Sequence, residues 1–374
     1  MKTKSILLMT CAAFMVACSN DSTVTDVSTN DAISFTSSIK SMTKAVYTNE
    51  TFDKFKVYAF VDGSDRDPDW SDDVVKVNAN KWVTSQIRNW PEEGDKQLTF
   101  FAYAPSDLNP TISRTEQKLA EFTPKSALAD QQDIVTAYNT GTRNGNKQGV
   151  DLKFRHALTQ IEILATNEDV LRYKVEVLGS KLVRVKNKAT MTFPTSATEA
   201  ATWSGLTGEQ SYRDKLPAAI TLNATPQRVM NDGNNWMMLP QQLTAWNKNE
   251  GGSSNGGAYI AVLLRISYAG GDAIYPNKKE GAPAKFAYAA IPVATNWEIG
   301  HKYTYTLKFF GKGGGAGVVA DDLTNPNAGA GNDSDVDEAP GKTTGQPIID
   351  GVINFNVQIK DWVDGAETTE TIEN

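Results

Sequence analysis

The chain has 374 residues, of which 40% are hydrophobic, and 37 Lys and Arg against 44 Asp and Glu give it a net charge of −7. This length allows one or two hydrophobic cores, and the scattered basic residues argue against nucleic acid as a partner. There are only two cysteines, and Cys11 lies in a segment that we expect to be removed, so disulfides are excluded as a source of stability.

The first 17 residues have the pattern of a signal peptide. Lys2 and Lys4 precede an apolar run from Ile6 to Ala17, which is too short to span a membrane as a helix. A cysteine follows at once, so residues 1–17 predict a lipoprotein signal and Cys18 the lipidation site. The alternative is an ordinary secretory signal that happens to be followed by a cysteine.

Residues 18–44 predict a polar tether followed by a first strand. Ser19 to Asp31 is rich in Ser, Thr, Asn and Asp, which is typical of a flexible spacer. Ile33, Phe35 and Ile39 then follow the alternation of a β-strand with one buried face.

Residues 45–166 predict an N-terminal β-sandwich. Phe55, Val57 and Ala59 share one face of a strand, and residues 98–104 are apolar on both faces, as in a covered strand. Helical signal is weak: Ile112 to Phe122 predicts about three turns, and Ser126 to Asp133 a short helical piece.

Residues 167–374 predict a second β-sandwich, so the fold class is all-β with two tandem sandwiches. The strongest strands span residues 259–268 and 303–309. Residues 311–345 are rich in Gly, Ala, Asn and Asp and predict a flexible loop. A terminal strand follows at 351–362, where Ile353, Phe355, Val357 and Ile359 alternate with polar residues.

No set of residues predicts catalysis or a metal site, so we expect neither an enzyme nor a cofactor. His156 and His301 are the only histidines, and neither belongs to a metal or protease motif. Gly252 to Gly256 matches G-x-S-x-G, but in a glycine-rich loop rather than at a strand-to-helix turn. Asp333, Asp335 and Asp337 have the spacing of a calcium loop without its glycine or its closing glutamate.

Short motifs along the chain resemble those of the fimbrillin family, the type V pilins and pilin-like surface lipoproteins of Bacteroidales. The motifs include the lipobox at Cys18, Trp90-Pro91, Phe154-Arg155-His156-Ala157-Leu158, Met238-Leu239-Pro240-Gln241, Trp297-Glu298-Ile299-Gly300-His301 and Lys360-Asp361-Trp362. The resemblance implies two transthyretin-like β-sandwiches and a cell-surface adhesive pilus subunit.

The resemblance also implies an assembly mechanism. A protease would cut between Lys44 and Ala45 and free the first strand with Ile33, Phe35 and Ile39. The terminal strand of another subunit, with Ile353, Phe355, Val357 and Ile359, would then fill the groove. The expected partners are therefore other pilin subunits, the outer membrane through the lipid, and a host or bacterial surface ligand. The best-known members of the family carry arginine where this chain has Lys44.

Two alternatives remain open at this point. The first and last strands can pair within their own domains, as terminal strands of monomeric sandwiches do. The chain can also be a surface lipoprotein that does not polymerise and binds glycans through exposed tryptophans, of which Trp70, Trp82, Trp90 and Trp203 are candidates.

Overall fold

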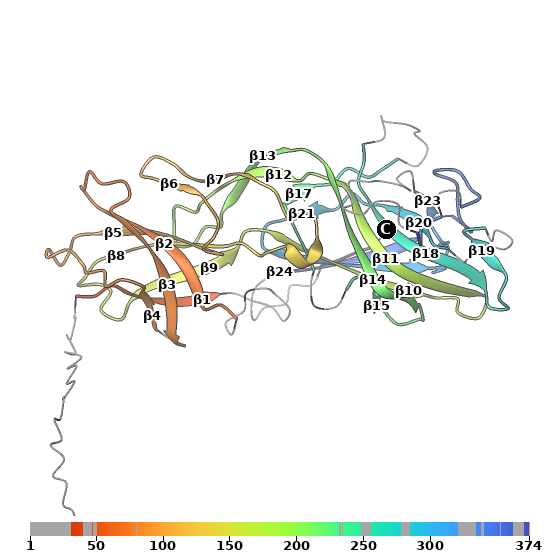
Figure 1. Ribbon diagram of the computed structural model, residues 1–374, viewed down its shortest axis with the longest axis horizontal. Coiled ribbons are helices and arrows are strands. Elements are labelled where there is room, and N and C mark those ends of the chain that lie inside the picture. The colour runs from red at the N-terminus through yellow and green to blue at the C-terminus, as the bar shows by residue number, and fades with distance from the viewer. Residues whose placement is uncertain are drawn as a thin grey trace, which may run out of the picture.

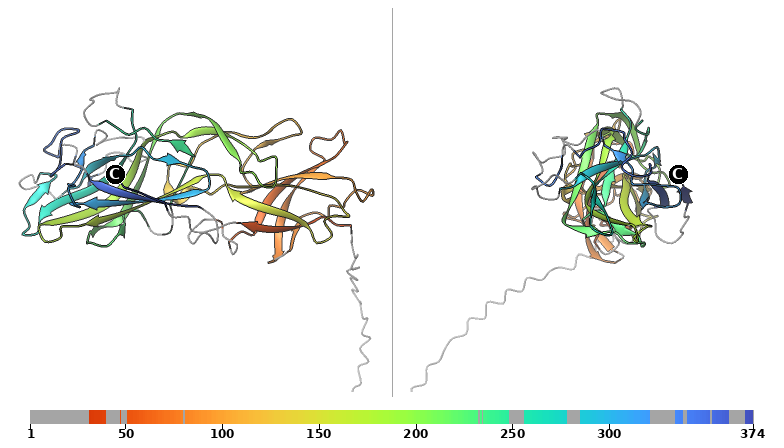
Figure 2. Two further views of the ribbon diagram at one scale, coloured as in Figure 1. Left: turned by 180° about the vertical axis from the view of Figure 1, so that it is seen from behind. Right: turned by 90° about the vertical axis from the view of Figure 1, so that its right-hand side faces the viewer.

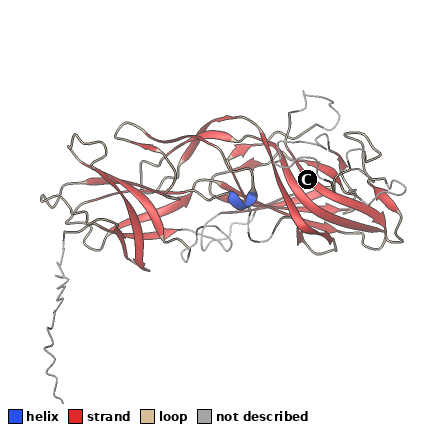
Figure 3. Cartoon of the chain, in the orientation of Figure 1, coloured by secondary structure: helices blue, strands red, loops and turns tan. Residues whose placement is uncertain are grey.

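The computed structural model describes residues 31–39, 47, 51–79, 81–231, 233, 235–247, 256–277, 285–320, 334–337, 340–351, 353–361 and 370–373. Strands run through an elongated body, with one part at each end of its long axis (Figure 1). Among the described residues the one helical element is the 3-10 helix η1 (Leu128–Asp130), drawn in blue in Figure 3. The predicted all-β class is therefore confirmed.

The N-terminal part is a closed barrel, at the end of the molecule drawn in red to yellow in Figure 1. Its strand order is β1-β4-β3-β2-β5-β8-β9. The strands are β1 (Ser34–Ile39), β2 (Lys54–Val61), β3 (Trp70–Asn78), β4 (Lys81–Thr84), β5 (Leu98–Ala104), β8 (Val135–Gly141) and β9 (Val150–His156). Because β1 and β9 pair directly, the strands form one circuit, and the transthyretin-like topology stays a prediction.

The C-terminal part consists of two facing sheets. One has the order β15-β10-β22-β24-β25, with β16 also paired to β10, and the other β14-β11-β18-β20-β23, with β19 also paired to β18. The bounds in the first sheet are β10 (Thr159–Asn167), β15 (Gln227–Arg228), β16 (Trp236–Met238), β22 (His301–Phe309), β24 (Asn354–Asp361) and β25 (Glu370–Glu373). Those in the second are β11 (Tyr173–Val185), β14 (Gln210–Thr221), β18 (Tyr259–Tyr268), β19 (Ala273–Tyr275), β20 (Ala287–Pro292) and β23 (Val318–Val319). Alternate apolar residues of both sheets meet in one core, for example Ile163 and Val262.

Two further small sheets complete the fold. The order β13-β12-β7-β6 joins β6 (Thr111–Ile112) and β7 (Gln117–Phe122), which follow the barrel strand β5, to β12 (Lys188–Thr192) and β13 (Thr202–Thr207), which follow β11. The second pairs β17 (Gln241–Gln242) with β21 (Asn296–Trp297). A separate core with Phe101, Tyr103, Met191 and Leu239 lies against the first of these sheets. Figure 2 shows from behind how strands pass over the region between the two parts.

The structure corrects two predictions about local structure. Ile112 to Phe122 is not helical, because β7 pairs with β12 and the backbone at Glu121 has a φ of 50°, which a helix does not allow. Only Leu128–Asp130 of the piece from Ser126 to Asp133 is helical. The last barrel strand, β9, ends at His156, and β10 starts at Thr159 in the C-terminal sheet, while the domain boundary at 166 stays a prediction.

Part of the expected flexible loop 311–345 is packed against the C-terminal sheets. Val318 and Val319 form β23 against β20, and Val336 bridges to Phe286. Ala320 and Val336 are buried against the outer face of the sheet that contains β18 and β20. Ala316 is buried in the core between the two sheets. The remaining residues, 321–333 and 338–339, lie outside the described part of the chain.

Candidate assembly strands

The first strand, β1, is hydrogen-bonded on both edges. It runs parallel to β9, with Phe35 to Ile39 opposite Val150 to Phe154. On its other edge it is antiparallel to β4, where Phe35 lies opposite Trp82. Since both edges are occupied, β1 is the strand that joins β9 to β4 and closes the barrel.

The three apolar side chains predicted for this strand all point into the barrel. Ile33, Phe35 and Ile39 are buried, and the ring of Phe35 lies 5.4 Å from that of Phe100 and 6.0 Å from that of Phe55 in edge-on contact. Burying a side chain of this size stabilises a fold by about 1.5–3 kcal/mol. A barrel that lost β1 would therefore expose a groove lined by aromatic rings.

Neighbouring segments contact β1 closely and hydrogen-bond to the residues before it. Gly149, before β9, has a φ of 105°, and a Cβ atom there would lie 3.1 Å from the carbonyl carbon of Phe35. Only glycine allows this close approach together with this backbone conformation. The Ile33 N–H donates to the Arg88 carbonyl oxygen at 2.7 Å, and the Trp90 N–H donates to that of Asp31 at 2.9 Å. These bonds fix the start of the strand.

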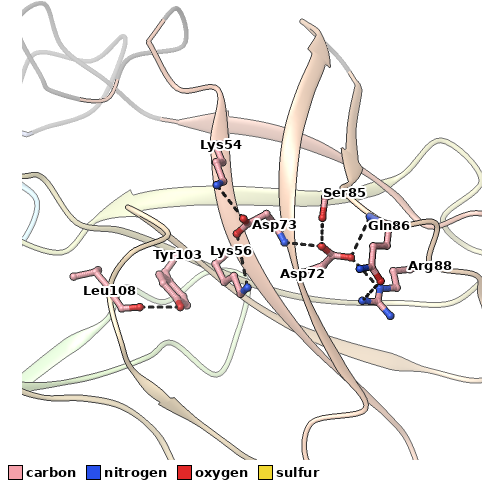
Figure 4. A network of polar contacts seen from close by, with 9 residues as sticks. All are labelled: Lys54, Lys56, Asp72, Asp73, Ser85, Gln86, Arg88, Tyr103 and Leu108. Carbon is pink, nitrogen blue, oxygen red and sulfur yellow. Dashed lines mark hydrogen bonds and ion pairs between the residues drawn. The ribbon is translucent and has the colours of Figure 1, made fainter.

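A buried carboxylate holds the segment that follows β4. Asp72 on β3 accepts hydrogen bonds from the Ser85 hydroxyl, the Gln86 N–H and the Arg88 side chain, the last at 3.0 Å (Figure 4). Burial raises the pKa of Asp72, but the bonds from Ser85 and Arg88 outweigh it, so the pKa lies below its usual value. The network thus holds the segment whose Arg88 carbonyl oxygen receives Ile33.

A hollow of about 910 Å³ opens beside the start of β1. Ala32, Ile33 and Ser34 line it together with the cations Lys81, Arg88, Arg143 and Lys147 and with one carboxylate, Glu92. The chain that enters β1 therefore borders a hollow whose charged lining is mainly cationic.

The last strand, β24, is paired inside the C-terminal part. It is antiparallel to β22 along its whole length and carries β25 on its other edge. Ile353, Phe355 and Val357 are buried, whereas Ile359 is half-buried. The imidazole Nε2 of His301 lies 2.9 Å from Asp361 at the end of this strand. The structure thus places the two candidate strands in different sheets of the same chain, each paired within its own part.

Three predicted site residues, Cys18, Lys44 and Ala45, lie outside the described residues. Lys44 comes five positions after Ile39, the last residue of β1. A cut between Lys44 and Ala45 therefore separates all of β1 from the rest of the chain.

The residues considered for chemistry have structural partners. The Nδ1 atom of His156 lies 2.7 Å from the Asp133 carboxylate, and both side chains are buried, as expected for a hydrogen-bonded structural histidine. Asp335 pairs with Lys215, and the G-x-S-x-G segment lies outside the described residues except for Gly256. The described residues contain no group of three or more His, Cys, Asp or Glu that could hold a metal ion. They also contain no helix that is both long and apolar enough to cross a bilayer.

The tryptophans offer no stacking platform in the part of the chain that the structure describes. Trp82, Trp90, Trp236, Trp246 and Trp297 are buried, Trp70 and Trp203 are half-buried, and Trp362 is not described. Nothing in these positions favours a glycan site built on exposed indole rings.

Comparison with known proteins identifies the family. The profile of the fimbrillin-like family matches residues 17–321. Fimbrium subunit Fim1C of Phocaeicola vulgatus is 27% identical over 254 residues, which cover 57% of this chain but only 64% of that subunit. A solved fimbrial protein from Bacteroides vulgatus is 19% identical, with a TM-score of 0.48, over 74% of this chain and 94% of its own.

A fimbrial assembly protein from Parabacteroides distasonis is 8% identical, with a TM-score of 0.42, over 92% of this chain and 99% of its own. The family profile covers most of the sequence and begins one residue before Cys18. This chain belongs to the fimbrillin-like family.

Proposed function

We propose that this chain is a structural and adhesive subunit of a cell-surface pilus, exported as a lipoprotein acylated on Cys18. A cut between Lys44 and Ala45 removes the lipid, the tether and β1 together. A strand of another subunit then takes the place of β1 in the barrel. Family membership and the similarity to a fimbrium subunit support the pilus, and the motifs at Cys18 and Lys44 support the processing.

The observation that carries the proposal is the position of β1 in the barrel. Among the strands that the structure describes, β1 alone links β9 to β4, and it fills the barrel core with Phe35. Main-chain groups of β4 and β9 then lack partners once β1 leaves, and a replacement strand can satisfy them while its alternate side chains fill the vacated positions. The two tandem transthyretin-like domains implied by the family belong to the same proposal.

The proposed donor is β24, whose apolar residues occur at intervals of two, as in β1. Its present pairing with β22 and β25 means that donation requires β24 to leave its own sheet. Phe355 and Val357 then exchange burial in the C-terminal core for burial in the barrel of the next subunit. The free energy of moving β24 from its own sheet to the next barrel is thus the difference between two states in which these side chains are buried.

Limited digestion of the purified precursor with a trypsin-like protease tests the proposal. The expected result is a new N-terminus at Ala45 and a ladder of polymers that resists SDS. A chain that is cut cleanly at Lys44 and stays monomeric would contradict the assembly mechanism.

Two variants test whether the cut that leads to polymers occurs at Lys44. Lys44→Gln is expected to prevent the cut and the ladder, whereas Lys40→Gln, four residues earlier, is expected to leave both unchanged. Ladders of equal yield from Lys44→Gln would place the productive cut elsewhere.

A further inference from the structure

β1 contains a polar side chain at a position that alternation assigns to the barrel interior. Ser37 lies between Phe35 and Ile39 in the inward-facing series that begins at Ile33. Its Oγ atom is closed off from solvent and has no hydrogen-bond partner among the described residues. Ser37 therefore interrupts an otherwise apolar face.

The surroundings of Ser37 are apolar. Its cross-strand neighbour on β9 is Leu152, which is fully buried, and the flanking Phe35 and Ile39 are buried as well. A hydroxyl that loses its bonds to water without gaining a protein partner destabilises the folded state. A strand with an apolar residue at this point would fit the same barrel better.

The last strand has such a residue. When Ile353 and Phe355 are aligned with Ile33 and Phe35, Val357 takes the place of Ser37, and Ile359 that of Ile39. If β24 enters the barrel in the opposite direction, Phe355 takes the place of Ser37, and Phe355 is also apolar. In either direction the donor candidate brings no polar group to this site.

We infer that Ser37 is the residue that makes β1 replaceable. Its unpartnered hydroxyl makes β1 bind the barrel less tightly than the strand that competes with it. The competing strand comes from a second copy of this chain and places an apolar side chain next to Leu152. This inference rests on the proposed strand exchange. After the cut, only noncovalent contacts hold β1, so its departure rate reflects how well it fits.

The test compares Ser37→Val with the unchanged full-length precursor. The variant is expected to unfold at a higher urea concentration before cutting. After cutting, it is expected to form SDS-resistant ladders at least fivefold more slowly at equal fractions of cut chain. Ser38→Val is the matched control, because Ser38 is exposed on the same strand, and it is expected to leave both measurements unchanged. If Ser37→Val does not fold, Ser37→Ala serves instead, with a smaller effect in the same direction.

The outcomes separate the two proposals. If Ser37→Val and the unchanged precursor form ladders at equal rates, the role of Ser37 is wrong, whereas strand exchange is not contradicted. An unchanged urea midpoint in Ser37→Val would also overturn it. If the unchanged precursor forms no ladder after the cut, strand exchange is wrong and the role of Ser37 is wrong with it.

Discussion

At the scale of single residues, Asp72 links the charge of one carboxylate to the geometry at the start of β1. Its side chain is buried on β3, and its partners Ser85 and Arg88 belong to the segment that receives the Ile33 N–H. Hydrogen bonds to an ionised group contribute more than neutral ones, about 1.5–3 kcal/mol each. The ionised carboxylate is therefore part of what holds β1 in place.

The pH dependence of this contribution has a definite sign. Because the pKa of Asp72 is lowered in the folded chain, its stabilisation is complete above the unfolded pKa of about 3.9 and is lost as the pH falls through the folded value. Asp72→Asn is expected to cost about 2 kcal/mol of unfolding free energy at pH 7 and clearly less at pH 3.

Urea unfolding of both chains at the two pH values measures the difference. Asp73→Asn is the control, since Asp73 is one-third exposed and pairs with Lys54 at 2.9 Å, and such surface pairs contribute less than about 1 kcal/mol. An equal cost of Asp72→Asn at pH 7 and pH 3 would contradict the account.

At the scale of elements, β7 and β12 couple the barrel to the C-terminal part. Met191 on β12 is fully buried, lies opposite Leu119 on β7, and belongs to the same core as Phe101 and Tyr103 on the outer face of β5. This explains why β5 is apolar on both faces, one toward the barrel interior and one toward the shared core. The local pattern of residues 112–122 could not reveal these partners, because pairing with β12 decides their conformation.

Met191→Ala is expected to destabilise both parts of the chain together. The cavity costs about 2–5 kcal/mol, and it lies in a core to which both parts contribute. Hydrogen exchange should therefore lose protection in β5 and in β12 alike, whereas Thr192→Ala, at the half-buried next position, should change little. Loss of protection in β12 without any change in β5 would show that the parts are independent.

At the scale of the whole molecule, the alternation of apolar and polar residues predicts where strands lie but not which strands pair. Residues 98–104, 303–309 and 353–359 form or lie largely within β5, β22 and β24, because a period of two is a property of neighbouring residues. The closure of the barrel depends on β1 and β9, where Thr36 and Asp151 pair across 115 positions of sequence. No local pattern contains that contact.

The same limit applies to the C-terminal part and to the candidate strands. Val318 and Val336 lie in a segment whose Gly and Asn content predicts a loop, yet they pack against the outer face of the sheet that contains β18 and β20. Val319 of the same segment packs into the core between the two sheets. The sequence also identified Ile33, Phe35 and Ile39 as a strand, but it gave no sign that Ser37 lacks a hydrogen-bond partner inside a barrel. Burial of a single hydroxyl depends on every strand around it.

The central claim is that β1 is removed before subunits join. The most direct measurement is the N-terminus of the chain in SDS-resistant polymers isolated from the cell surface, determined by mass spectrometry. If β1 is exchanged, the subunits begin at Ala45 and carry no lipid. Polymers whose subunits begin at acylated Cys18 and retain Ile33 to Ile39 would contradict it.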